Sequence, residues 1–352
     1  MKFRVIGFVI IFLSLSIFVS QGKKKNFLSN SETIISENHD LYDIVYVGKF
    51  PDIGENKNST WFSNLFSFDF PYKNKFTAFL FGNELQNKLR PISVLASSPD
   101  SVFFLDQANG VLIRTFGNVG EITHFKGKKN LKFPSLIGCC SFERQEILFT
   151  DSRLNQVFKY NPIENSVKYL NNKLVFNNPT GIAYSTENEE IWVVETGAHR
   201  IQVLDKNGNF IKYIGTRGKT DGNVNFPTFI WIDDLGIVYV VDTMNFRVQM
   251  FDNAGQFLSF FGEPGDSPGS LARPKGIATD NLGNIYVVDA LFNNVQVFDK
   301  TGKLLTVFGK LGNGNEELWL PVGLFIDKNN YIYVADSYNS RIQIFKLVKN
   351  ND

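Results

Sequence analysis

One unit recurs six times along this chain, and that repetition constrains the fold more than any other feature. Each copy has a proline before one short apolar run and an acidic residue at the end of a second run. The prolines are Pro91, Pro134, Pro179, Pro227, Pro274 and Pro321, and the acidic residues are Asp106, Asp151, Glu195, Asp242, Asp289 and Asp336. The acidic residues follow one another at intervals of 44 to 47 residues. A four-stranded repeat of about 40–50 residues is typical of a propeller blade. The sequence therefore predicts an all-β fold, a six-bladed β-propeller of four-stranded antiparallel blades.

The copy at residues 273–309 shows the four strands most clearly, at 273–278, 284–289, 294–299 and 304–308. The second of these runs is continuously apolar, as expected for a strand buried on both faces between neighbouring blades. Asp280 follows the innermost strand and is expected to make an Asx turn, as is Asp233 in the preceding copy. Gly255 and Gly302 suit the hairpins between the third and fourth strands.

The last copy lacks its fourth strand, because the chain reaches its C-terminus just after the third, at 341–347. A ring left open would expose two strand edges, which are templates for aggregation. An N-terminal strand at 44–50 can complete the last blade, and a segment at 77–82 is a rival for the same place. We favour the first, which makes the propeller domain 44–348 with its ring closed by an N-terminal strand.

Residues 51–75 form an aromatic-rich insertion in this domain. Trp61, Phe62, Leu65 and Phe66 have the spacing of one helical face. Two interpretations stay open: a plug that packs on the propeller, and a contact with a membrane surface or a partner.

The first 22 residues resemble an export signal. Lys2 and Arg4 precede an apolar run at 5–19, which has the length of a signal-peptide core and is short for a full membrane span. Three lysines follow at 23–25, so an uncleaved membrane anchor is the alternative to a cleaved signal. A polar tether fills 23–43. Both interpretations predict an exported protein, in the periplasm, outside the cell or anchored to a membrane.

The charge balance argues against a nucleic-acid partner. The chain has 36 basic and 35 acidic side chains, whereas binding to a phosphate backbone needs clustered excess Lys and Arg.

The two cysteines, Cys139 and Cys140, are adjacent. That spacing fits neither a disulfide nor a zinc framework, so we interpret them as small buried residues.

Three segments carry a more specific resemblance. Residues 195–203, 242–249 and 336–343 resemble the NHL repeat signature, in which an acidic residue is followed five positions later by arginine, here Arg200, Arg247 and Arg341. The resemblance covers about residues 82–347 and is strongest in the last four copies. It is to the exported bacterial type of six-bladed NHL propeller. It implies the fold and leaves the function open, because propellers of this class include lyases, lactonases, RNA readers and protein docks.

The residues argue against the catalytic members of that class. The three histidines, His39, His124 and His199, fall in the tether, at the rim of the first blade and in a repeat motif, so they are not expected to converge on a metal. None of the six innermost strands carries a carboxylate of the kind that calcium needs. We therefore predict no catalytic residue, no metal site and no cofactor.

The six acidic residues allow two interpretations. As structural repeat anchors, each accepts hydrogen bonds from its own loop and orients the arginine that follows. As a ring of ligands, they would contact a partner. Because every blade has one, the structural interpretation is favoured.

The loops between second and third strands give the better functional signal. They carry Met244, Phe246, Leu291, Phe292 and Tyr338, flanked by Arg247 and Arg341. Clusters of aromatic residues and arginine are typical of binding hot spots, although these rings can also pack under neighbouring loops. The sequence predicts a non-enzymatic exported scaffold that docks a protein or peptide of the cell envelope on this face, with membrane association through the N-terminal segment. The alternative is an exported propeller enzyme, a lyase or lactonase acting at the channel mouth.

Overall fold

The computed structural model describes residues 42–50, 89–116, 119–123 and 133–349. The predicted export segment at 1–22, the tether before residue 42, the insertion at 51–75 and the rival strand at 77–82 lie outside the described residues. In the described part of the chain, no helix has the length and apolar character that a membrane span needs.

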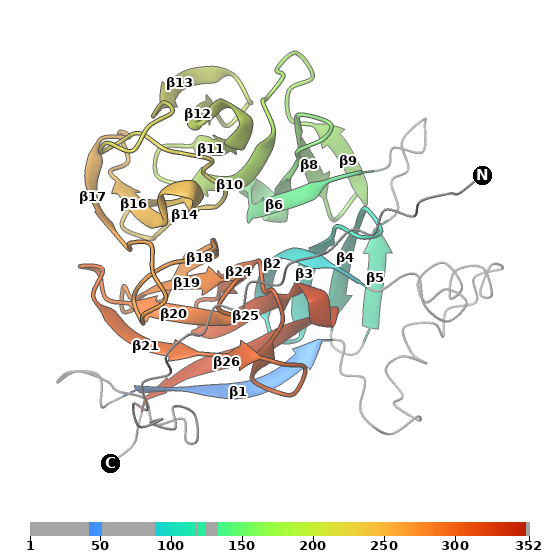
Figure 1. Ribbon diagram of the computed structural model, residues 1–352. Coiled ribbons are helices and arrows are strands. Elements are labelled where there is room, and N and C mark those ends of the chain that lie inside the picture. The colour runs from blue at the N-terminus through green and yellow to red at the C-terminus, as the bar shows by residue number, and fades with distance from the viewer. Residues whose placement is uncertain (1–41, 51–88, 117–118, 124–132, 350–352) are drawn as a thin grey trace, which may run out of the picture. The chain divides into compact units, whose positions relative to one another are not determined.

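Six four-stranded antiparallel sheets form the blades of a propeller, as predicted (Figure 1). The first three blades are β2 (Pro91–Ser98), β3 (Ser101–Asp106), β4 (Val111–Phe116) and β5 (Val119–Thr123); β6 (Leu136–Ser141), β7 (Ile147–Asp151), β8 (Gln156–Asn161) and β9 (Ser166–Tyr169); and β10 (Pro179–Ser185), β11 (Glu190–Glu195), β12 (Arg200–Asp205) and β13 (Phe210–Ile214). The last three are β14 (Ile230–Ile232), β15 (Val238–Asp242), β16 (Arg247–Phe251) and β17 (Phe257–Phe261); β18 (Pro274–Thr279), β19 (Ile285–Asp289), β20 (Asn294–Phe298) and β21 (Leu304–Phe308); and β24 (Leu324–Ile326), β25 (Tyr331–Asp336), β26 (Arg341–Lys349) and β1 (Tyr42–Phe50).

Short elements complete the described chain. Four 3-10 helices are η1 (Glu143–Gln145), η2 (Thr196–Ala198), η3 (Thr243–Asn245) and η4 (Ser337–Asn339). Between the fifth and sixth blades, β22 (Lys310–Leu311) and β23 (Glu317–Leu318) form a small parallel pair. The connections that enter the third, fourth and sixth blades lie at the same end of the blades as η2, η3 and η4, because they accept hydrogen bonds from these helices.

The ring is held together by apolar clusters between the blades. Each of six clusters joins residues of two neighbouring blades, including one between the last blade and the first. Trp192, Tyr286 and Tyr333 are among the largest fully buried side chains. Full burial of a large apolar side chain stabilises a fold by about 1.5–3 kcal/mol. The stability of the ring therefore depends on packing between blades as well as within them.

The innermost strands approach one another closely around the centre, and glycine makes this approach sterically allowed. The Gly181 amide donates to the Thr228 carbonyl over 2.7 Å, and the Gly276 amide donates to the Val322 carbonyl over 2.8 Å. A Cβ atom at Gly276 would lie 2.5 Å from that carbonyl oxygen, which no real side chain tolerates. The inner strands are thus linked directly, backbone to backbone.

The N-terminal strand closes the ring, as the sequence predicts. β1 is the outermost strand of the last blade and pairs antiparallel with β26, from Tyr42 opposite Lys349 to Phe50 opposite Ile342. Ile44 and Tyr46 face the cluster between the fifth and sixth blades, whereas Val45 is exposed. Strand β1 begins two residues before the predicted domain start.

The turns after the innermost strands of the fourth and fifth blades also form as predicted. Asp280 Oδ1 accepts the Leu282 and Asn284 amides, which is the Asx geometry, and Asp233 does the same for Leu235 and Ile237. The second oxygen of Asp280 accepts the Tyr286 hydroxyl over 3.0 Å. Aspartate here therefore positions the hairpin and satisfies a buried tyrosine.

Candidate functional site

The six acidic repeat residues lie on one face of the propeller, which we call the loop face: the loops between second and third strands together with the connections between blades. All six are 0% exposed. In every blade the carboxylate accepts a backbone amide from the segment that enters the same blade; the donors are Arg90, Ser135, Asn177, Asn225, Ala272 and Trp319. Burial raises the pKa of Asp106 and Asp336, although these hydrogen bonds oppose that shift. Each carboxylate thus fastens the incoming connection to its own blade.

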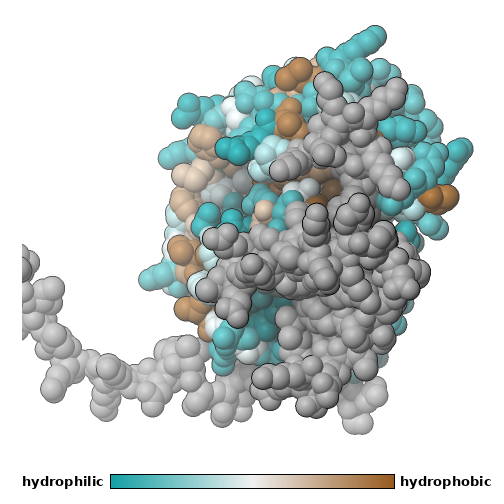
Figure 2. All heavy atoms as spheres, turned by 90° about the vertical axis from the view of Figure 1, so that its right-hand side faces the viewer, coloured by the Kyte–Doolittle hydropathy of each residue, from teal (hydrophilic) through white to brown (hydrophobic). Residues whose placement is uncertain are grey.

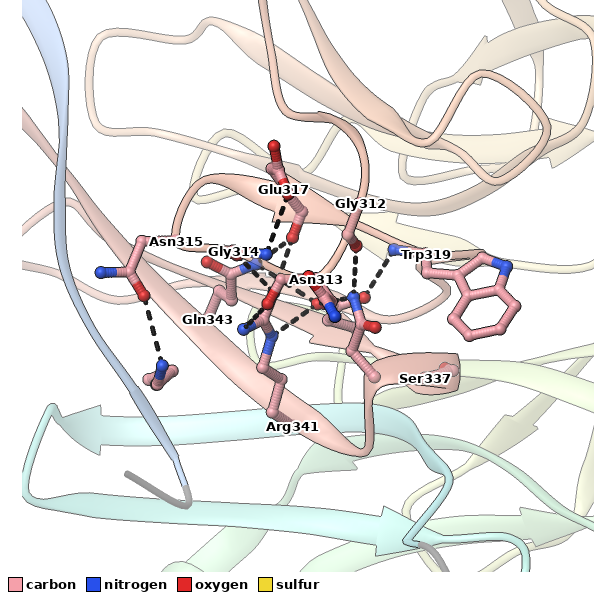
Figure 3. Close-up of polar contacts among 12 residues, drawn as sticks. Gly312, Asn313, Gly314, Asn315, Glu317, Trp319, Ser337, Arg341 and Gln343 are labelled. Carbon is pink, nitrogen blue, oxygen red and sulfur yellow. Dashed lines mark hydrogen bonds and ion pairs between the residues drawn. The ribbon is translucent and has the colours of Figure 1, made fainter. Parts of the chain in front are cut away.

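The arginine five positions later pairs with the acidic residue in three blades and, in the fourth and sixth, extends this network to the preceding connection. In the last blade, Arg341 Nε donates to Asp336 over 2.7 Å, and its terminal nitrogens donate to the carbonyls of Asn313, Gly314 and Glu317 in the preceding connection (Figure 3). Arg247 does the same for Asp242 and for the carbonyls of Thr220 and Asn223. The guanidinium groups therefore hold the connections between blades in one conformation.

A left-handed residue follows each acidic residue by four positions. Its φ lies between 53° and 65° in all six blades; the residues are Gly110, Asn155, His199, Phe246, Asn293 and Ser340. Glycine and asparagine adopt this conformation readily, whereas a bulky side chain there is strained. Phe246 is therefore the strained member of the set, and it lies in one of the loops that the sequence predicts to bind a partner.

Three of these residues also join neighbouring blades. His199 Nδ1 accepts the Phe226 amide over 3.1 Å, and the rings of these two residues contact each other edge to face, with centroids 4.3 Å apart. In the same way, Asn293 Oδ1 accepts the Leu320 amide over 2.8 Å, and Asn155 Oδ1 accepts the Asn178 amide over 2.9 Å. Burial lowers the pKa of His199. Because Nδ1 is the acceptor, His199 is neutral in this arrangement.

The residues predicted for a partner-binding face divide into two groups. Met244, Leu291 and Tyr338 are exposed, by 50%, 57% and 42%, and Phe246 and Phe292 are half-buried beside them. Arg247 and Arg341 are buried and hold the connections, so their charges are not presented on the surface. Only the apolar part of the predicted set reaches solvent.

Sequence reasoning missed further exposed rings on the same face. Trp319 and Phe226 are 45% and 41% exposed, and Trp319 contacts Tyr338 with ring centroids 5.6 Å apart. The guanidinium of Arg90 lies 5.0 Å from the centre of the Tyr338 ring. Both missed residues lie within two positions of a repeat proline, so aligning the connections as well as the loops would have found them. On the side of the molecule drawn in Figure 2, hydrophobic residues form separate patches among hydrophilic ones.

In the second, third and fourth blades, the residue after the repeat proline pairs its hydroxyl group with the hydroxyl of the residue after the acidic one. Ser135 pairs with Ser152, Thr180 with Thr196 and Thr228 with Thr243, at oxygen–oxygen distances of 2.6–2.7 Å. Cys139 and Cys140 are free thiols, and burial raises the pKa of Cys139 to about 12. Within the described residues, no three His, Cys, Asp or Glu side chains gather as metal ligands. Of the three histidines, only His199 lies in the described residues.

Comparison with known proteins supports the fold. Residues 270–350 match a family described as "6-bladed beta-propeller", and residues 176–204 match the NHL repeat. No curated protein matches the chain in sequence.

Solved structures with the same fold have different functions. Virginiamycin B lyase from Staphylococcus aureus is 16% identical with a TM-score of 0.55, over 74% of this chain and 96% of that one. A gluconolactonase from Xanthomonas campestris is 12% identical with a TM-score of 0.56, over 74% and 87%. An auxiliary nutrient binding protein from Bacteroides thetaiotaomicron is 12% identical with a TM-score of 0.58, over 73% and 69%. At such identities the likeness shows the fold alone, and the two family matches add the repeat. The chain thus has the six-bladed β-propeller fold and carries an NHL repeat at residues 176–204.

Proposed function

We propose that the protein is a non-enzymatic binding scaffold that docks a protein or peptide on its loop face. The observation that carries this proposal is an exposed apolar side chain at the same position of each of the last three blades, two residues after the acidic one: Met244, Leu291 and Tyr338. Trp319, which is also exposed, contacts the Tyr338 ring. Large apolar groups at the surface of loops mark interaction sites when they lie together, and Trp and Tyr are the residues most enriched in binding hot spots.

The loops that carry these side chains are fixed before any partner binds. Arg247 and Arg341 link the acidic repeat residues to the connections between blades through buried hydrogen bonds. A preorganised surface loses less conformational entropy on association, so more of the contact energy appears as affinity. This is the physical advantage of a propeller as a docking platform.

The partner in this proposal is an exported or envelope protein or peptide. The support is the N-terminal sequence, whose basic start and apolar run at 5–19 resemble an export signal or membrane anchor.

Capture of the partner tests the proposal. The double variant Met244→Ser, Leu291→Ser removes two apolar contacts from the loop face. The control is Leu235→Ser, Leu282→Ser, since these leucines are also exposed, by 84% and 49%, but lie on the turns after the innermost strands. Full-length protein and both variants are cross-linked to envelope proteins of the source cell and the captured species are identified. We expect one species that the parent and the control capture stoichiometrically and that the loop-face variant loses. Equal capture by both variants would contradict the proposal.

The alternative from the sequence is a lyase or lactonase acting at the channel mouth. Elemental analysis of the purified full-length protein separates the two functions. A stoichiometric divalent metal would favour the enzyme, and activity of the parent on lactones or on cyclic depsipeptides would establish it.

A further inference from the structure

The fifth blade departs from the hydroxyl pattern of the three blades that precede it. In the second, third and fourth blades, the residue after the repeat proline pairs its hydroxyl with the residue after the acidic anchor. In the fifth blade these two positions are Lys275 and Ala290. A pair of small neutral groups is thus replaced by one long cationic side chain and a methyl group.

Lys275 has no anionic partner in the described part of the chain. It is half-buried and forms neither a hydrogen bond nor an ion pair with the described residues. The nearest repeat carboxylate, Asp289, is fully buried and accepts the amides of Ala272, Arg273, Leu291 and Phe292. That carboxylate is therefore saturated by its own loop.

A second cation lies next to Lys275. Arg273 is exposed, and its side chain also has no partner among the described residues. Burial and, to a smaller extent, the nearby guanidinium of Arg273 together lower the pKa of Lys275 to about 8. Desolvation and a like charge both disfavour the ammonium form, and an opposite charge reverses both effects.

Lys275 lies at a junction between innermost strands. Gly276 donates its amide to Val322, so Lys275 lies where the innermost strands of the fifth and sixth blades meet. The Thr228–Thr243 hydroxyl pair occupies the matching position of the preceding blade. None of the innermost strands contributes a carboxylate that would repel an anion.

We propose that Lys275 and Arg273 form a binding site for a small oxyanion, a carboxylate or a phosphate group, at the inner end of the fifth blade. Lys275 supplies a partly desolvated ammonium, and Arg273 supplies a planar guanidinium that can hold two oxygens at once. The site goes beyond the proposed docking of a partner, because a free anion can occupy it without one.

Lysine acylation measured residue by residue tests the site. Full-length protein is treated briefly with an N-hydroxysuccinimide acetate ester at pH 7.5, and the modified lysines are quantified by mass spectrometry. With a pKa of about 8, about a quarter of Lys275 is uncharged at this pH, against about one in a thousand for an ordinary lysine. We expect Lys275 to react at least about tenfold faster than the exposed Lys300.

The acylation is repeated in the presence of citrate and of inorganic phosphate. Sodium chloride at matched ionic strength and glucose, a neutral solute, are the controls. An anion at the site raises the pKa of Lys275 and slows its acylation several-fold, while Lys300 stays unchanged. Whichever of citrate or phosphate protects more strongly identifies the class of ligand. Arg273→Gln should weaken the protection.

Three results would overturn the site: slow acylation of Lys275 in the free protein, equal effects of the anions on Lys275 and Lys300, or full protection in the Arg273→Gln variant. Partner capture is measured separately, so failure of the docking proposal and failure of the anion site are distinguishable.

Discussion

The Nε atom of Arg341 lies 2.7 Å from the Oδ2 atom of Asp336, and the two side chains are 8% and 0% exposed. The matching pair of the third blade, Arg200 and Glu195, is equally close, but Arg200 is 31% exposed. Removing one partner of a buried ion pair costs about 3–5 kcal/mol, because the other charge stays buried without compensation.

We therefore expect Arg341→Ala to lower the free energy of unfolding by about 3–5 kcal/mol. Arg200→Ala should cost clearly less, since water can reach Glu195 once the exposed guanidinium is gone. Urea titrations of the two variants check this difference. Equal losses of unfolding free energy in the two variants would show that burial of the ion pair does not determine how much it stabilises the fold.

The closing strand gives a second prediction. Tyr46 packs edge to face on Phe345 with ring centroids 5.8 Å apart. The preceding residue of the same strand, Val45, is exposed. Tyr46→Ala should lower the unfolding free energy by about 1–3 kcal/mol, because the contact with the last blade is lost. Val45→Ala should change it by less than about 0.5 kcal/mol. The thermal midpoints of the two variants measure the contrast, and similar values would argue against packing of β1 as the element that closes the ring.

Phe246 gives a prediction in the opposite direction. Its φ of 56° is unfavourable for a bulky residue, and asparagine occupies the same position in the second and fifth blades. Phe246→Asn should therefore raise the unfolding free energy by about 1 kcal/mol. If Phe246 contributes to docking, the same variant should bind the partner less well although its fold is more stable. A lower thermal midpoint would mean that packing of the half-buried Phe246 ring stabilises the fold by more than its strained backbone destabilises it.

His199 makes stability depend on pH. Its pKa in the folded protein lies below the usual value of 6.5, because burial disfavours the charged ring. Above about pH 6.5 both states are neutral and the imidazole accepts the Phe226 amide. As the pH falls below 6.5, the unfolded chain takes up a proton before the folded one does, so stability decreases until the folded pKa is passed.

His199→Asn should remove this dependence, because asparagine accepts the equivalent amide in the second and fifth blades without titrating. Urea midpoints of both proteins between pH 7.5 and 5 give the comparison. Parallel curves for parent and variant would show that His199 is not the titrating group.

The spacing of the acidic residues was enough to predict the ring. Blades, strand order and closing strand follow from it, because a propeller repeat has one way to bury its apolar strands, between two neighbours. The missing fourth strand after β26 likewise required a donor from elsewhere in the chain. These are consequences of period and polarity, which are fully visible in the sequence.

The surface was less predictable. Arg247 and Arg341 were expected to flank a partner, yet each is buried against a carboxylate and a connection between blades. Their burial depends on carbonyls 24 to 28 residues earlier in the chain, which no local pattern shows. Trp319 was overlooked for the same reason, since its neighbour Tyr338 belongs to another loop. The docking of a partner and the place of the protein in the cell stay predictions.

The pairing of Tyr42 with Lys349 has a consequence for orientation. β26 starts at Arg341, beside η4 on the loop face, and ends at the opposite face, where β1 begins. The chain therefore enters the propeller on the side away from Met244, Leu291 and Tyr338.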